Sequence, residues 1–136
     1  MVQHELASVL NLAAALAPAA TTDGTRNGAD TNLAGYDAAT FIFVGGVVTD
    51  GTHTPSLQHA DDDGAGAAGA YTAVAAADLV GTPVALTSSN DPLVQKLGYK
   101  GGKKWVRAVL VTTGATTGGV IGAVCVRGEP GKAAVT

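Results

Sequence analysis

The stretch that decides the fold class is Lys104–Thr113, which reads Lys-Trp-Val-Arg-Ala-Val-Leu-Val-Thr-Thr. Tryptophan, valine and threonine are enriched in β-strands, and turn residues flank the run on both sides. A second apolar run, Val120–Arg127, follows the turn Gly-Ala-Thr-Thr-Gly at Gly114–Gly118, so we expect the two strands to form a hairpin. Both runs are apolar on both faces, which predicts central positions in a sheet.

Working outward towards the N-terminus, the same kind of segment recurs roughly every 8–15 residues, separated by turns that contain Gly, Asp or Asn. The predicted strands are Ala39–Thr49, Thr54–Ala60, Tyr71–Ala75, Val84–Thr87 and Leu93–Leu97. No interior segment has a convincing helical period. This pattern predicts an all-β protein, either an antiparallel β-sandwich or a jelly-roll-like fold.

The two ends of the chain read differently from the middle. Within residues 1–20, Leu6, Leu10 and Leu16 fit a helical stripe that Pro18 would stop, but an extended segment fits as well. We favour an arm or strand that pairs with the domain, and keep the helix as the alternative. We therefore expect an N-terminal arm over 1–20, a sandwich over 21–128 that starts with a loop over 21–35, and an extended tail over 129–136.

Composition excludes several classes of function. The 136 residues carry a net charge of −3, and the lysines and arginines of the second half read as solvated strand edges, which argues against nucleic-acid binding. No run reaches about 18 consecutive apolar residues, so we expect no membrane span. The Ala-rich start lacks the basic residues of a secretory signal. We expect a soluble protein made in the cytoplasm.

The residues that could carry chemistry lack partners at suitable spacing. Cys125 sits in an apolar run and reads as a small buried hydrophobe. His4, His53 and His59 are the histidines of the chain. His53 and His59 lie six residues apart, which matches no ligand pattern, and both are expected to be plain surface residues. Asp61–Asp63 reads as a solvated loop tip, because the alternating acids of a calcium loop are absent. We expect no catalytic residues, no cofactor and no metal.

Trp105 and Arg107 share one face of their strand, because alternate residues of a strand point the same way. The single tryptophan of the chain could be a platform for a sugar, but a core or interface anchor is the favoured interpretation. The side chains that we expect at interfaces with other subunits are Leu6, Leu10, Leu16, Trp105 and Arg107.

A set of turn and strand-edge segments then carries a resemblance that covers roughly residues 33–128. The segments are Leu33–Ala39 (Leu-Ala-Gly-Tyr-Asp-Ala-Ala), Asp50–Pro55 (Asp-Gly-Thr-His-Thr-Pro), Val74–Gly81 (Val-Ala-Ala-Ala-Asp-Leu-Val-Gly), Val94–Gly101 (Val-Gln-Lys-Leu-Gly-Tyr-Lys-Gly), Lys103–Arg107 (Lys-Lys-Trp-Val-Arg) and Gly114–Gly118. In this order they resemble small proteins encoded among the head genes of tailed bacteriophages and prophages.

The resemblance implies a non-enzymatic virion protein that decorates or cements the capsid shell. Its partners would be the major capsid protein and neighbouring copies of itself, with a trimer as the preferred assembly, and its place would be the capsid surface. Two alternatives stay open. One is a neck- or tail-associated structural protein, and the other is a virion-surface carbohydrate-binding module, which would expose Trp105 or Tyr99 among polar neighbours.

Overall fold

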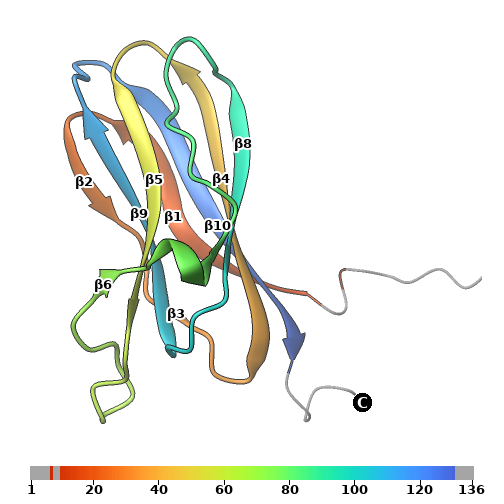
Figure 1. Ribbon diagram of the computed structural model, residues 1–136. Coiled ribbons are helices and arrows are strands. Elements are labelled where there is room, and N and C mark those ends of the chain that lie inside the picture. Colours follow the sequence, from red (N-terminus) through yellow and green to blue (C-terminus); the bar gives the residue numbers. More distant parts are fainter. Residues whose placement is uncertain (1–6, 8–9, 131–136) are drawn as a thin grey trace, which may run out of the picture.

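The fold is a sandwich of two antiparallel sheets, as predicted (Figure 1). The computed structural model describes Ala7 and residues 10–130. The first sheet has the order β1 (Asn11–Thr21), β10 (Gly119–Pro130), β4 (Tyr36–Val48), β8 (Leu93–Tyr99), β7 (Leu79–Val80). The second has the order β2 (Gly24–Asn27), β9 (Trp105–Thr113), β5 (Thr52–Ala60), β6 (Thr72–Ala73), and β3 (Thr31–Asn32) also pairs with β9. A 3-10 turn, η1 (Ala76–Asp78), precedes β7.

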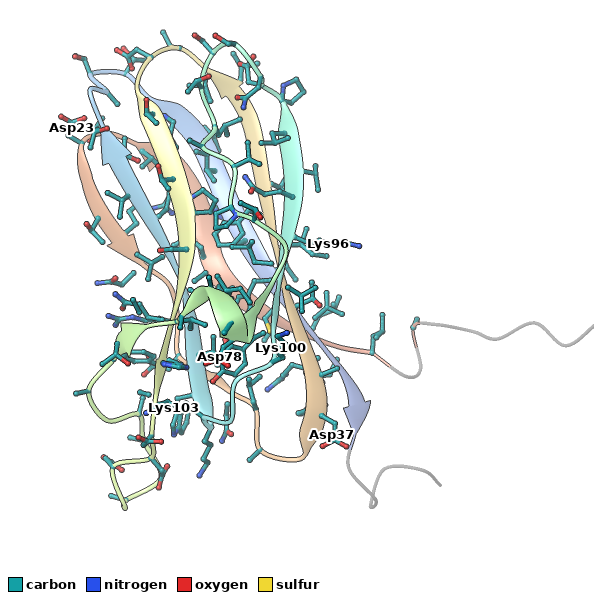
Figure 2. The ribbon with its side chains drawn as sticks, viewed as in Figure 1. Asp23, Asp37, Asp78, Lys96, Lys100 and Lys103 are labelled. Carbon is teal, nitrogen blue, oxygen red and sulfur yellow. The ribbon has the colours of Figure 1, made fainter. Side chains whose placement is uncertain are left out.

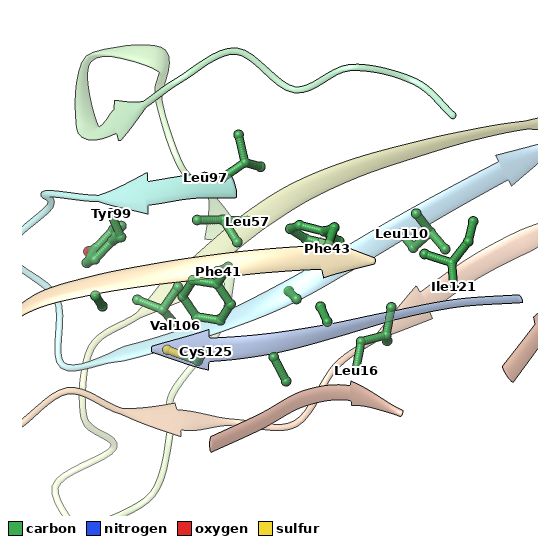
Figure 3. Close-up of a cluster of buried hydrophobic side chains, with 14 of the residues drawn as sticks. Leu16, Phe41, Phe43, Leu57, Leu97, Tyr99, Val106, Leu110, Ile121 and Cys125 are labelled. Carbon is green, nitrogen blue, oxygen red and sulfur yellow. The ribbon is translucent and has the colours of Figure 1, made fainter. Parts of the chain in front are cut away.

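The core lies between the two sheets and is built mainly from inward-facing residues of the longer strands. The buried side chains include Phe41, Phe43, Leu97, Ile121 and Cys125 from the first sheet and Leu57, Val106 and Leu110 from the second (Figure 3). Alanines fill the narrower places, which suits a chain with so few aromatic residues. Along most of β4 and β5, buried side chains therefore alternate with more exposed ones.

The predicted hairpin of the last two strands is wrong. β9 lies in the second sheet beside β5 and β2, whereas β10 lies in the first sheet between β1 and β4. The loop Gly114–Gly118 therefore crosses from one sheet to the other. Its crossing is fixed by the Asp50 carboxylate, which accepts the backbone N–H groups of Thr116, Thr117 and Gly118 at 2.6–3.3 Å. The expectation of central positions is confirmed for both strands.

Two other local predictions also differ from the structure. The predicted loop over 21–35 contains the short strands β2 and β3. The predicted strand Val84–Thr87 is instead an irregular segment in which Leu86 makes one isolated bridge to His53. In place of backbone pairing, the side-chain amide of Gln95 accepts a hydrogen bond from the Val84 N–H and donates one to the Val84 carbonyl.

The ends of the described chain belong to the first sheet. β1 pairs with β10 from Asn11 to Thr21, so the helical alternative is wrong there, and this part of the expected arm is an edge strand. β10 continues to Pro130, so the expected tail begins inside the sheet. The remaining parts of the arm and tail, residues 1–6, 8–9 and 131–136, lie outside the described residues.

Candidate interaction surface

Two histidines that were expected on the surface are buried. His53 is fully buried, with Nδ1 hydrogen-bonded to Thr112 Oγ1 at 2.8 Å and Nε2 3.2 Å from the Asp50 carbonyl oxygen. The Nδ1 atom of His59 lies 3.0 Å from the Tyr99 hydroxyl. The signal that could have located them was strand alternation, since both share a face with Leu57 on β5. His4 lies outside the described residues.

The one cysteine is a core residue, as its apolar run predicts. Cys125 is fully buried on the inner face of β10, and burial raises the pKa of its thiol to about 11. At neutral pH the thiol is therefore protonated, and its contribution is that of a small apolar side chain.

The acidic loop after β5 is bound to the protein's own cations. Asp61 accepts from Lys103 Nζ at 2.6 Å, and Asp62 accepts from Lys104 Nζ at 3.1 Å and from Trp105 Nε1 at 3.0 Å. The hydrogen bonds from Trp105 and Lys104 lower the pKa of the Asp62 carboxyl, and the one from the Trp105 indole has the largest effect. Asp63 instead caps the loop, with its Oδ1 accepting backbone N–H groups of Ala65 and Ala67. In the part of the chain that the structure describes, no group of three His, Cys, Asp or Glu residues could hold a metal ion.

The two predicted interface residues of β9 make contacts within the chain. Arg107 donates two hydrogen bonds to Gln58 Oε1 at 2.7 and 2.9 Å, and its guanidinium carbon lies 4.0 Å from the centre of the Tyr71 ring. The Tyr71 hydroxyl in turn donates to Asp30 at 2.7 Å, and burial together with Asp30 raises the pKa of that phenol. Trp105 and Arg107 are half-buried, and they hold the loop between β5 and β6 against the second sheet.

The predicted leucines of the N-terminal segment have different places. Leu16 is 5% exposed and belongs to the core, because a register shift in β1 turns both Ala15 and Leu16 inward. Leu16 was predicted to be an interface residue, but in this fold its side chain packs inside the sandwich. Leu10 is half-buried and lies near Gly128 of β10. Leu6 lies outside the described residues.

A surface that sequence reasoning missed is the outer side of the first sheet. Outward positions of β1, β10, β4 and β8 carry aliphatic side chains that lie beside one another in the ladder: Leu12 beside Val126, Ile42 beside Val124, and Val44 beside Val94. We call this set, with Val120, the outer apolar face: Leu12, Ile42, Val44, Val94, Val120, Val124 and Val126. Leu12 and Val94 are about two-thirds exposed at 66% and 65%. The signal was present in the sequence, since strands that are apolar on both faces bury only one of them here.

The outer apolar face has a shallow hollow beside β1. Register shifts between Ala14 and Ala19 displace the edge strand and place Pro18 over Gly122. A Cβ at Gly122 would lie 2.8 Å from Pro18 Cγ, so only glycine fits under the proline. The hollow has a volume of about 320 Å³, and Val44, Val120 and Val124 are among the residues that line it.

The edge of β1 is covered by the chain itself. Arg26 donates to Thr21 Oγ1 at 2.7 Å and to the Ile121 carbonyl at 3.1 Å, and it also reaches the carbonyl of Ala17. The Ala29 N–H donates to the Ala15 carbonyl at 2.8 Å. The contacts to the carbonyls of Ala15 and Ala17 use β1 acceptors that an added strand would need, so this part of the edge is blocked against strand addition.

A larger, open groove of about 850 Å³ lies between the start of β4 and the turn after β8. Lys96, Lys100 and Asp37 are among its lining residues, and Figure 2 shows Asp37 near one end of the sandwich and Lys96 near its middle. Its charged lining residues are Asp37 and four lysines, of which Lys103 and Lys104 are paired with Asp61 and Asp62. Its glycine-rich turn, Gly101–Gly102, offers few side chains that could select a ligand.

Comparison with known proteins gives no match: no family model, no curated protein and no solved structure matches this chain. Among residues 10–130 and Ala7, no helix is long and apolar enough to cross a membrane.

Proposed function

We propose that this protein is a non-enzymatic structural subunit that acts by packing against other protein subunits. The observation that carries the proposal is the outer apolar face of the first sheet. Contiguous apolar surface of this kind on a monomer marks a site of interaction, because leaving it in water is unfavourable.

The side chains that could take part in catalysis support this proposal, because they make contacts that stabilise the fold. His53 and His59 are hydrogen-bonded inside the sandwich, and Cys125 is a protonated core thiol. Asp50 and Asp62 bind backbone and side-chain donors that fix loops. A catalytic group needs access to substrate, whereas these groups stabilise the fold.

The sequence resemblance supplies the proposed assembly. We assign the protein to the virion of a tailed phage, as a head decoration or cement protein made in the host cytoplasm and held on the capsid surface. Its proposed partners are the major capsid protein and other copies of the chain. A surface with few charged residues at its centre is typical of the buried part of such interfaces.

Electron microscopy of particles purified from the source cells tests this proposal. We expect density of this sandwich at regular positions on the outer shell of the head. Density at the neck or tail would change the place but keep the structural role. Particles that lack the protein, with all of it free in the unsedimented fraction, would contradict the proposal.

A further inference from the structure

We infer that the outer apolar face pairs with the same face of a second copy of this chain, in a two-fold symmetric dimer. The inference rests on the proposed function, because it names the partner of the surface that the function uses. It replaces the threefold assembly that the resemblance implies with a sheet-on-sheet pair.

The size of the face fits one partner of its own dimensions. Four strands at about 4.8 Å spacing and seven residues of β8 at about 3.4 Å rise give a flat area of roughly 450 Å². Projecting valines and the rim of the face add to this area. Stable interfaces begin at about 600 Å² per partner, which is more than this flat area. A stable contact therefore has to use the whole face and its rim, and a small peptide would leave much of the face in water.

The charge distribution also permits a like-with-like contact. Lys96 of β8 lies beside Ile42 of β4, towards one side of the sheet. The other outward positions named above are aliphatic. A dimer can leave this lysine at the rim, where its long side chain reaches water. The middle of the contact then buries no charge, and the cost of desolvating one is avoided.

The shape of the outer apolar face is suited to contact with the same face of a second copy. It has projecting valines over β4 and β10, and the hollow at Gly122 lies beside them. Under a two-fold axis, a projection of one copy can enter the hollow of the other, and the reverse contact follows by symmetry. Two aligned sheets pack this way in sandwich cores, at about 10 Å separation.

The covered edge favours this geometry over strand addition. Arg26 and Ala29 donate to the β1 carbonyls of Ala17 and Ala15, and β7, at the other end of the first sheet, has only two residues. A two-fold pair uses one surface patch once, whereas a trimer needs two different patches on each copy. One broad face therefore fits a dimer.

The test is light scattering coupled to size-exclusion chromatography, over a range of concentrations, on the full chain and two matched variants. Val124 is 38% exposed on the central strand β10, and Val111 is 39% exposed on the central strand β9 of the other sheet. We expect the full chain and V111K to give the mass of a dimer, and V124K to weaken the dimer by at least about tenfold. The double variant V44K/V124K should be monomeric.

Circular dichroism must show that the lysine variants are folded, and a variant without residues 1–9 tests whether that segment covers the face. A monomeric full chain, a trimer, or a dimer that V44K/V124K leaves intact would overturn the inference. So would dimerisation that appears only after residues 1–9 are removed. A monomer that still binds the head shell through the same valines would sink the dimer but keep the proposed function.

Discussion

At the scale of single residues, Asp50 shows how a polar side chain sets the path of the chain. It lies in the loop between β4 and β5, and its carboxylate accepts three backbone N–H groups from the loop between β9 and β10. Both loops cross between the sheets, so one carboxylate joins the two crossings at one end of the sandwich. The hydrogen bonds to Gly118 and Thr116 lower the pKa of this carboxyl.

This arrangement predicts an acid-dependent loss of stability. Because the folded-state pKa is depressed, the stabilisation is complete above about pH 5 and declines as pH falls through that lower pKa. Thermal unfolding should therefore show D50N less stable than the natural chain at neutral pH, with the two melting temperatures converging in acid. D37N is the control, since Asp37 is exposed and lies at the other end of β4. A constant difference between D50N and the natural chain from pH 7 to pH 3 would contradict the account.

At the scale of elements, the loop between β9 and β10 explains why strand positions were easier to predict than strand partners. Runs of β-branched and aromatic residues located β4, β9 and β10, and the turns that flank them helped to locate β5 and β8, because both signals are local in the sequence. The choice between hairpin and sheet crossing depended on contacts with Asp50 and Thr21, about 70 and 100 residues away. The strands β2 and β3 were missed because their few polar residues pair only through the neighbouring β9.

Two glycines of this loop offer a matched test of the crossing. Gly114 and Gly118 have nearly the same positive φ, 71° and 72°. A Cβ at Gly114 would meet no atom within 4 Å, whereas one at Gly118 would lie 1.7 Å from the Thr21 carbonyl oxygen. We expect G114A to lower the free energy of unfolding by about 1 kcal/mol from backbone strain alone. G118A should cost at least about 2 kcal/mol, because β1 must also move away.

Chemical denaturation monitored by Trp105 fluorescence measures both values. Equal losses for the two variants would mean that the close approach of β1 to the crossing loop does not constrain it. A greater loss for G114A would contradict the geometry of the loop.

At the scale of the whole molecule, the candidate surface was the least predictable feature. The sequence indicated interface residues in the N-terminal segment and on β9, but Leu16 is in the core, and Trp105 and Arg107 bind the acidic loop and Gln58. When a strand is apolar on both faces, the face that is buried depends on where the second sheet packs. The local sequence pattern does not predict where that sheet packs. The side-chain alternation of β10 becomes informative only once Cys125 is known to point inward.

The central claim is that the outer apolar face is covered by another protein subunit. The most direct measurement is the rate of thiol alkylation of V44C and V124C, compared with V111C on the second sheet. Cys125 is buried, with a pKa raised to about 11, so the natural chain sets a low background. We predict that V44C and V124C react slowly in the concentrated or assembled sample and speed up on dilution, while V111C reacts at one rate throughout. Equal and rapid alkylation of all three positions under assembling conditions would contradict the claim.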